Sequence, residues 1–226
     1  MYCCQIVKIF DLPISTEINK AIPKNSFDTY VSYKQRKQFS ELIDRIKWAN
    51  KLSKQTINLN GSDIHEIQIF EITLKCKTYA DEVLDAIDKA IPYPIIFISS
   101  YEDEYFVRLA FKHPNPANEN ISVLDWTYKS AWLNGADQPF VLNLKYSLDR
   151  VVNDFAIQLS GKKFTKRVSS TQLVETEQKI CAIEKAIFQL KKAIKKEVQF
   201  NKKVEMNTEL HELNAKLKRI TDKFTY

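Results

Sequence analysis

Residues 65–75 read HEIQIFEITLK, and this stretch decides the fold because its apolar residues occupy both faces of an extended chain. Ile67 and Ile69 share one face of the strand, while Phe70 and Ile72 share the other. The apolar residues therefore change from one face to the other between Ile69 and Phe70. Such a pattern is typical of a strand buried on both faces at its centre, or of a strand with a bulge at this change. We therefore expect this strand to lie inside a sheet.

The polar residues of the same strand raise the hypothesis of a nuclease centre. Glu71, Thr73 and Lys75 share a face at period two; a helix and a hairpin precede them, and a helix and a strand follow. This order resembles the restriction-endonuclease core in outline, which implies acids that hold Mg²⁺ and a lysine that activates water. Thr73 stands where that resemblance calls for lysine, so the candidates are Glu71 and Lys75 with the nearest acids, Asp63 and Glu66. The alternatives are a salt bridge within the sheet and a degenerate, inactive centre.

The chain upstream of this strand is predicted to form a hairpin and two helices. Asn60-Gly61 separates two strand-like runs, which indicates a hairpin whose loop is longer than two residues. Nearer the start, we expect a short strand over residues 5–10 and a brief helix within residues 13–23. Between them, helical spacing of apolar residues predicts a helix over residues 32–52. The residues on its apolar face are Phe39, Leu42, Ile43, Ile46 and Ala49.

Downstream of the same strand, helices and strands alternate. An apolar helix is predicted to end at Pro92, and Ser147 and Gly161 are expected to cap and end a later one. Three strands are expected between these helices, over residues 94–100, 105–111 and 121–132. The element order predicts an α/β or α+β body over residues 1–160, in which helices flank a mixed β-sheet.

Beyond Gly161 the chain changes to a basic hinge, residues 161–170, and then to a helical arm, residues 171–226. Apolar residues of the arm step by three and four, which is the spacing of a coiled coil. The register slips between Gln199 and Thr208, so the arm is either one rod with a stutter or a helical hairpin. Its apolar seam requires a cover, from this chain, a second copy or a partner protein. The seam residues expected to bind a partner are Ile183, Ile187, Leu190, Ile194, Leu213 and Leu217.

Positive charge is concentrated in this last third of the chain. Residues 1–161 contain 18 Lys and Arg against 20 Asp and Glu, whereas residues 162–226 contain 16 against 8. A basic segment separated from the rest of the chain is typical of proteins that bind phosphate backbones or acidic partners. The alternative is that these lysines form the solvent-exposed face of a coiled coil. The residues predicted to contact DNA phosphates are Lys162, Lys163, Lys166, Arg167, Lys192 and Lys196.

Composition excludes several classes of enzyme. The chain has only three glycines, so no phosphate-cradling loop can be built, and its three histidines lack the spacing of a metallohydrolase site. No serine lies in a nucleophile elbow, and the four cysteines have neither zinc-site spacing nor the density of a disulfide scaffold. Apart from Mg²⁺ in the nuclease hypothesis, we expect no metal or cofactor. No apolar run approaches the roughly 20 residues that span a bilayer, so we expect a cytoplasmic protein with no membrane partner.

Five segments together resemble an uncharacterised bacterial family of unknown function. The segments are FDLPISTEINKAIPKNSF (10–27), IKWANKLSKQTINL (46–59), EIQIFEITLK (66–75), IDKAIPYPIIFI (87–98) and KKEVQFNKKVEMN (195–207). Members of that family are encoded beside DNA methyltransferases and helicase-type ATPases in restriction-like phage-defence loci. The resemblance implies an accessory subunit without a defined catalytic activity. Our leading hypothesis is that such a subunit docks these partners through its helical arm.

Overall fold

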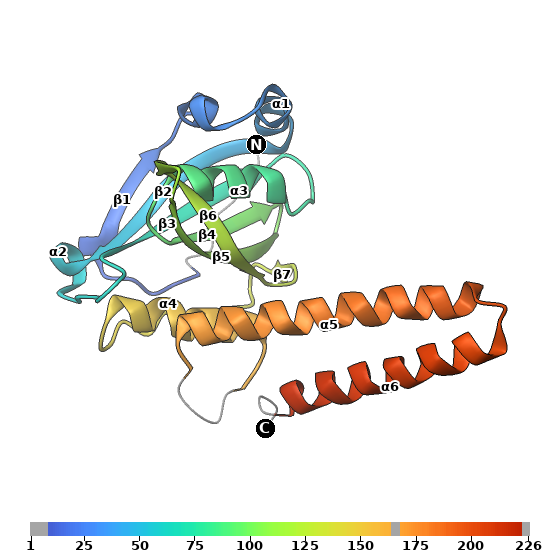
Figure 1. Ribbon diagram of the computed structural model, residues 1–226. Helices are drawn as coiled ribbons and strands as arrows, with labels where there is room; N and C mark the ends of the chain where they lie inside the picture. The colour runs from blue at the N-terminus through green and yellow to red at the C-terminus, as the bar shows by residue number, and fades with distance from the viewer. Residues whose placement is uncertain (1–8, 164–167, 223–226) are drawn as a thin grey trace. The chain divides into compact units, whose positions relative to one another are not determined.

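The computed structural model of the chain describes residues 9–163 and 168–222 (Figure 1). The chain divides into two compact units, Met1–Gly161 and Lys162–Tyr226. Most of the strand expected over residues 5–10 lies outside the described residues. None of the helices in the described part of the chain combines the length and the hydrophobicity needed to cross a membrane.

The first unit is built on one mixed β-sheet with the strand order β1-β2-β3-β4-β5-β6. Only the β3–β4 pair is parallel; the other neighbours on this path are antiparallel, and the short β7 pairs with β5. The strands are β1 (Glu17–Ala21), β2 (Ile43–Ser53), β3 (Glu66–Leu74), β4 (Ile95–Tyr101), β5 (Glu104–Asn115), β6 (Asn118–Lys129) and β7 (Leu133–Asn134). A parallel pair requires a crossover, which α3 (Asp81–Ala90) provides. The predicted mixed sheet flanked by helices is confirmed.

Two sets of helices flank the sheet. The first unit contains η1 (Ile14–Thr16), η2 (Lys24–Tyr30), α1 (Tyr33–Leu42), α2 (Lys54–Ile57), α3 and α4 (Leu148–Ser160). Phe70 and Ile72 of β3 belong to one core cluster with residues of α1, η2 and α3. On the other face, Phe155 of α4 meets Phe10 edge to face, with ring centroids 5.6 Å apart. Helices therefore supply apolar side chains to both faces.

Strand β3 is buried on both faces, as the first of the two sequence interpretations states. Ile67 and Ile69 are at most 1% exposed, and Phe70 and Ile72 are at most 2% exposed. The register of β3 with β4 runs without interruption from Gln68 to Thr73, so β3 itself carries no bulge. The change of face between Ile69 and Phe70 reflects two separate core layers that meet at the centre of the sheet.

The helix predicted over residues 32–52 is wrong in its second half, because α1 ends at Leu42 and β2 begins at Ile43. β2 has two register irregularities against β3, and the first inserts one residue between Ile43 and Arg45. The first insertion keeps Ile43 and Ile46 in one core cluster. Ala49 is the residue inserted at the second irregularity, and Leu52 pairs with Ile67 on the other face, so the fully buried residues recur at nearly helical spacing. They are Ile43, Ile46, Ala49 and Leu52.

The brief helix predicted within residues 13–23 is also wrong. Only Ile14–Thr16 forms a single 3-10 turn, and the edge strand β1 follows it. All five residues of β1 are exposed, so no buried side chain marks its period, and Asn19 interrupts it with a positive φ of 50°. Short, exposed edge strands have little sequence signal of this kind.

The hairpin predicted around Asn60-Gly61 joins β2 to β3, although the residues before Asn60 form α2 and a loop instead of a strand. Gly61 is needed for close packing, because a Cβ there would lie 2.0 Å from the carbonyl oxygen of Ile64. Asp149, in the first turn of α4, fastens this loop. Its carboxylate accepts hydrogen bonds from the backbone N–H groups of Ser62 (2.6 Å), Ile64 (2.9 Å) and Asp63 (3.0 Å).

These bonds change the acidity of Asp149. Partial burial acts to raise the pKa of the carboxyl, but the backbone N–H groups of Ile64, Ser62 and Asp63 together outweigh it and lower the pKa below 3.8. The helix that carries Asp149 has the predicted ends: Ser147 accepts a bond from the Arg150 N–H (3.2 Å), and Gly161 adopts a positive φ of 66°. The loop before β3 is thus fixed to a well-capped helix.

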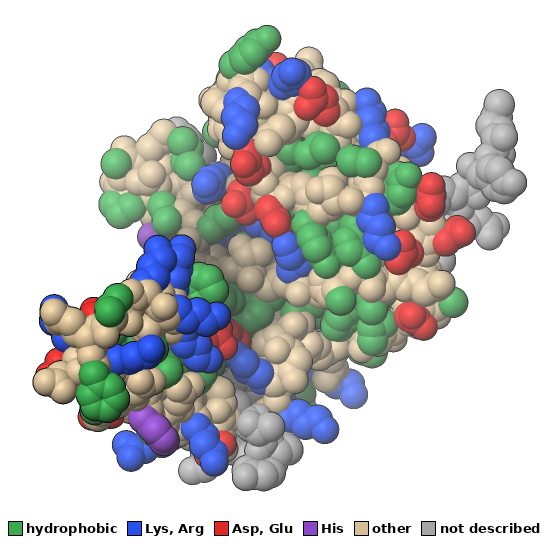
Figure 2. Space-filling view, turned by 90° about the vertical axis from the view of Figure 1, so that its right-hand side faces the viewer, with side chains coloured by type: hydrophobic (Ala, Val, Ile, Leu, Met, Phe, Trp, Pro, Cys, Tyr) green, Lys and Arg blue, Asp and Glu red, His purple; other side chains and the backbone are tan. Residues whose placement is uncertain are grey.

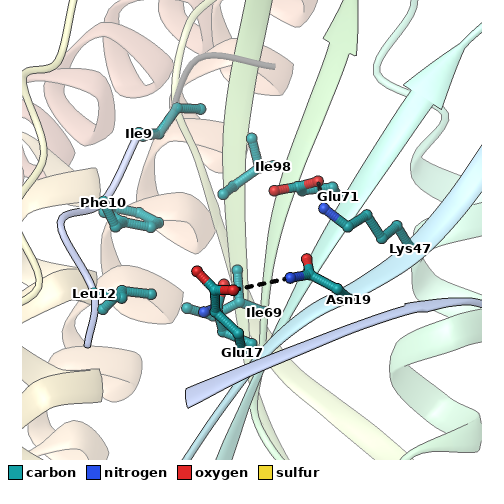
Figure 3. Close-up of a pocket in the computed structure, with 10 residues that line it drawn as sticks. Ile9, Phe10, Leu12, Glu17, Asn19, Lys47, Ile69, Glu71 and Ile98 are labelled. Carbon is teal, nitrogen blue, oxygen red and sulfur yellow. Dashed lines mark hydrogen bonds and ion pairs between the residues drawn. The ribbon is translucent and has the colours of Figure 1, made fainter. Parts of the chain in front are cut away.

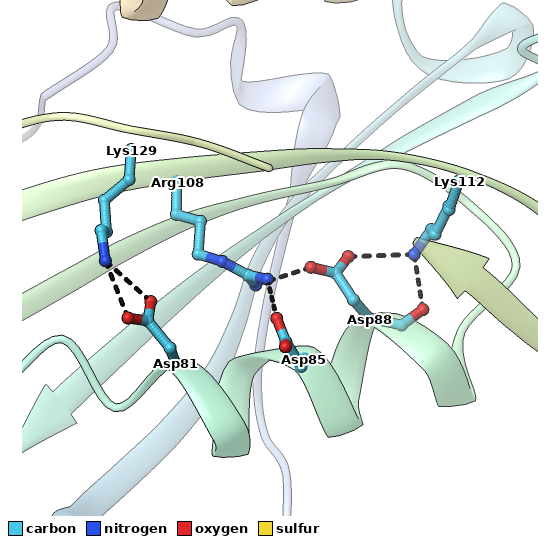
Figure 4. A network of polar contacts seen from close by, with 6 residues as sticks. All are labelled: Asp81, Asp85, Asp88, Arg108, Lys112 and Lys129. Carbon is cyan, nitrogen blue, oxygen red and sulfur yellow. Dashed lines mark hydrogen bonds and ion pairs between the residues drawn. The ribbon is translucent and has the colours of Figure 1, made fainter. Parts of the chain in front are cut away.

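A buried charge network joins α3 to β5 (Figure 4). The side chains of Arg108 and Asp88 are both 0% exposed, and Arg108 Nη1 donates to Asp88 Oδ2 at 2.7 Å. Lys112 Nζ donates to the other oxygen of Asp88 at 3.0 Å, and Arg108 also pairs with Asp85. Burial lowers the pKa of Lys112 and raises that of Asp85. In the sequence Arg108 and Lys112 alternate with apolar residues, as solvent-exposed side chains do. In the structure they are instead bound to carboxylates of α3.

We predict that Asp88→Ala destabilises the protein by about 3–5 kcal/mol, because it leaves Arg108 and Lys112 buried without their shared carboxylate. Asp81→Ala is the matched control, since it removes an ion pair of the same helix at 2.8 Å whose Asp81 side chain is 53% exposed. The control should lose less than about 1 kcal/mol. Urea unfolding measures both values, and equal losses would contradict a special role for the buried pair.

The second unit is a helical hairpin. α5 (Ser170–Lys196) and α6 (Phe200–Thr221) are joined by residues 197–199, and α6 lies alongside α5 (Figure 1). Ser169 caps α5 by accepting a bond from the Gln172 N–H at 3.2 Å. The slip in apolar register thus marks a reversal of the chain, and the helical-hairpin alternative for the arm is the one adopted.

Candidate functional site

A pocket of about 400 Å³ opens on the sheet face that carries Ile69 and Glu71 (Figure 3). Strands β1 to β4 supply most of its wall, and the segment before η1 supplies the rest. Its lining residues are Ile9, Phe10, Leu12, Glu17, Asn19, Lys47, Asn50, Ile69, Glu71 and Ile98. One side of the pocket is apolar and the other is polar, so its lining is more polar than that of most small-molecule sites.

Strand register brings the central polar pair of the pocket together. Lys47 of β2 lies directly opposite Glu71 of β3, and Lys47 Nζ donates to Glu71 Oε2 at 3.0 Å. The side chains are 30% and 18% exposed, so the pair is open to the pocket but partly desolvated. Ile98 of β4 follows Glu71 in the same row across the sheet. Lys47 thus neutralises a carboxylate that would otherwise be costly at this depth.

Backbone irregularities place the two asparagines of the pocket. The second irregularity of β2 lies between Trp48 and Asn50, so that Asn50 pairs with Ile69 and shares the pocket with Lys47. Bulges often lie beside functional sites because they re-aim a side chain. Asn19, with its positive φ of 50°, donates from Nδ2 to Glu17 Oε2 at 3.1 Å. Asparagine tolerates this conformation better than most residues.

The polar set of the pocket contains carboxylate and amide oxygens, and its negative charge is modest. Glu17 and Glu71 supply carboxylate oxygens, and Asn19 and Asn50 supply amide oxygens, all of which suit Mg²⁺. Within the described ranges, 9–163 and 168–222, no group of three or more His, Cys, Asp or Glu residues could hold a metal ion. A cation here would therefore depend on two glutamates, beside the positive charge of Lys47.

The structure does not bring the four nuclease candidates together. Asp63 lies in the loop before β3, and the Glu66 carboxylate pairs with Lys51 at 2.5 Å. Lys75 follows the end of β3 and donates to the Ser40 carbonyl at 2.7 Å. Because Glu66 and Glu71 are five residues apart in an unbroken strand, they project from opposite faces. Of the four, only Glu71 lines the pocket.

Sequence reasoning did not find Lys47, Glu17 or the asparagines. Lys47 falls in the segment interpreted as a helix, and its pairing with Glu71 depends on strand register, which no local pattern reveals. Glu17 lies in the exposed edge strand that was interpreted as helix. The only available signal was the polar face of the 65–75 strand, which identified Glu71.

The hairpin covers much of the seam that was expected to bind a partner. Ile183 and Ile187 are buried, at 7% exposure each. Four further seam residues are half-buried: Leu190, Ile194, Leu213 and Leu217. A partner that binds the hairpin in this form must therefore contact side chains outside the seam.

The predicted phosphate contacts are distributed over the start and the far end of the hairpin unit. Lys192 and Lys196 are exposed on α5, four residues apart and thus on one face, and Lys163 is exposed as well. Lys162 pairs with Glu177 at 2.5 Å. The two remaining candidates, Lys166 and Arg167, lie outside the described residues.

Residues 10–217 match the model of a domain of unknown function, DUF4391. The chain belongs to the DUF4391 family. This match covers nearly all of both units, so the body and the hairpin are parts of one family domain. A search of the curated proteins found no match for this DUF4391 chain, and a search of the solved structures found none either.

Proposed function

We propose that this DUF4391 protein is a non-catalytic accessory subunit of a restriction-modification-like phage-defence system. Its helical hairpin docks the DNA methyltransferase and helicase-type ATPase subunits of that system, and its lysines lie near the DNA backbone without reading sequence. The observation that carries the proposal is the hairpin itself, a separate helical unit with 16 basic residues against 8 acidic ones in residues 162–226.

The hairpin suits a docking role because α6 covers only part of the seam, and several seam residues stay half-buried. α5 and α6 pack along one another, so the outward faces remain available to a partner. Those faces carry mainly lysine, glutamate and amide side chains, with a few large apolar residues among them. Surfaces of this type give electrostatic steering and specificity at an interface.

Docking predicts a stable complex with the subunits encoded beside the gene. When full-length tagged protein is co-expressed with the methyltransferase and the helicase-type ATPase, at least one of them should co-elute in size-exclusion chromatography. Light scattering then gives the mass of the complex. If the protein elutes without either subunit, docking is refuted, and a doubled mass without partners would identify a homodimer instead.

Proximity to DNA predicts a change in salt dependence when exposed lysines are removed. Lys192→Ala with Lys196→Ala should weaken duplex binding equally for all sequences, and the slope of log K against log salt should fall by about 0.9 per lost phosphate contact. Lys34→Ala with Lys37→Ala on α1 is the control, because these side chains are 77% and 68% exposed in the body. An unchanged slope in the α5 variant would show that Lys192 and Lys196 do not contact DNA phosphates.

A second candidate function is a Mg²⁺-dependent nuclease, and the pocket is the observation that favours it. Glu71 lies on the third antiparallel strand of the sheet, with α3 and the parallel strand β4 after it, in the order that resembles a restriction-endonuclease core. Glu17 and Glu71 would hold the metal, which would supply the charge that polarises a phosphate. Lys47 would take the place of the lysine that is missing at Thr73 and orient the attacking water.

The nuclease candidate predicts Mg²⁺-dependent cleavage of DNA that Glu71→Gln abolishes and that Lys47→Ala reduces by at least about 100-fold. Lys75→Ala serves as the control because Lys75 does not line the pocket. Gel analysis of single- and double-stranded substrates at several Mg²⁺ concentrations measures the activity. Cleavage that survives Glu71→Gln, or no cleavage at any Mg²⁺ concentration, would exclude this pocket as a nuclease centre.

A further inference from the structure

The turn between α5 and α6 exposes large apolar side chains at the end of the hairpin. Val198 is 93% exposed, Phe200 is 77% exposed and Val204 is 48% exposed. We call residues 195–204 the hairpin tip. Figure 2 looks onto this end of the hairpin, where lysine side chains lie beside exposed hydrophobic ones. Clustered exposed apolar residues of this kind mark interaction sites more often than chance.

The apolar residues of the tip are not part of the hairpin's own seam. Phe200 and Val204 are four residues apart and share a face of α6. The half-buried residues of that helix fall at other positions: Met206, Leu210, Leu213, Leu217, Ile220 and Thr221. Folding of the hairpin therefore leaves Phe200 and Val204 in solvent, and a second surface is required to bury them.

The tip is held in one conformation by Glu197. Its carboxylate accepts hydrogen bonds from the backbone N–H groups of Gln199 at 2.8 Å and Val198 at 2.9 Å. The backbone is continuous with both helices, because the Glu197 N–H donates to Ala193 O and the Lys203 N–H donates to Gln199 O, each at 3.0 Å. A pre-organised loop loses less conformational entropy when it binds than a flexible one.

The charge around the tip restricts the kind of surface that it fits. Four lysines flank the apolar residues, and all four are exposed: Lys195, Lys196, Lys202 and Lys203. Glu197 is the single acid of the tip, and the N–H bond from Gln199 is the main cause that lowers its pKa below 4.5. Its carboxylate therefore stays ionised near neutral pH.

These features favour a protein surface over a phosphate surface. Contacts with DNA phosphates use the lysines alone and leave Val198 and Phe200 without a role. An ionised Glu197 at the apex would also face the phosphates of DNA or of anionic lipid headgroups. A protein groove lined by apolar side chains and rimmed by Asp and Glu complements both the apolar apex and its lysines.

We propose that the hairpin tip is a docking site, which inserts Val198 and Phe200 into an apolar groove of a partner protein while acidic residues on the rim of that groove pair with Lys195, Lys202 and Lys203. The inference rests on the proposed docking function and deepens it, because it names the contact residues and the chemistry of the partner surface. The rest of the hairpin then supports the tip and holds its contact residues in place.

The test measures binding of the full chain to purified methyltransferase and helicase-type ATPase subunits by calorimetry. Val198→Asp with Phe200→Asp should weaken binding by about 30-fold or more, the loss typical of a central interface residue. Phe188→Asp is the matched control, because Phe188 is equally apolar and 68% exposed on α5 but lies outside the tip. Its affinity should stay within about threefold of wild type.

A second arm tests the charge complementarity and the rival surfaces. Lys195→Glu with Lys202→Glu should weaken binding to the same subunit, and raised salt should reduce the difference from wild type. Duplex DNA and vesicles of anionic phospholipid are probed in parallel. Circular dichroism checks that each variant keeps its helices, which these exposed positions should not disturb.

The outcomes separate the two proposals. If wild type binds neither subunit, the docking function fails and the docking site at the tip fails with it. If wild type binds and Phe188→Asp is as damaging as the tip variant, or the tip variant is unaffected, the docking site at the tip is refuted while the docking function stands. If the tip substitutions instead abolish binding to DNA or to vesicles and leave subunit binding intact, the tip contacts phosphate and the inference is overturned.

Discussion

The parallel pairing of β3 with β4 is the constraint on which the body of this protein depends. Two adjacent strands that run in the same direction need a crossover, and the crossover places α3 across one face of the sheet. That face becomes a dry core, in which even Arg108 and Asp88 are fully buried. Their mutual charges compensate for the lost water, so α3 is attached by an ion pair as well as by apolar packing.

The opposite face of the same strands is only partly covered, and this asymmetry creates the pocket. Ile69 is buried there, while Glu71 remains open beside Lys47. In the structure Glu71 pairs with Lys47, and this ion pair links β2 to β3. Because one topology can support many activities, the arrangement of the strands does not define one.

The helical unit follows a different physical logic. A long amphipathic helix is unstable when its apolar side faces water, and this chain solves the problem by folding α6 back along α5. The cost of this solution is a tight turn, and Val198 and Phe200 remain exposed in it. The most exposed side chains of the hairpin are therefore those of the tip and of the lysine-bearing faces. The charge is divided between the units in the same way: the body is near neutral, and the excess positive charge lies in residues 162–226.

Local patterns in the sequence determined the elements whose signals lie within a few residues of one another. Ser147 and Gly161 mark the ends of α4, the two apolar layers of the 65–75 segment mark a central strand, and the register slip near Gln199 marks the end of a helix. The separation of charge at residue 161 is likewise visible in composition alone.

Tertiary structure decided everything that depends on strand register or on the packing of distant segments. β2 has apolar residues at helical spacing, and only its pairing with β1 and β3 makes it a strand. Arg108 and Lys112 alternate like solvent-facing cations until α3 covers them. Lys47 meets Glu71, which is 24 positions further along the chain. The physical reason is the sequence distance between the interacting residues. Periodicity and capping depend on neighbours within one or two helical turns. A pocket depends on which distant strands pair and on how far a bulge shifts their register.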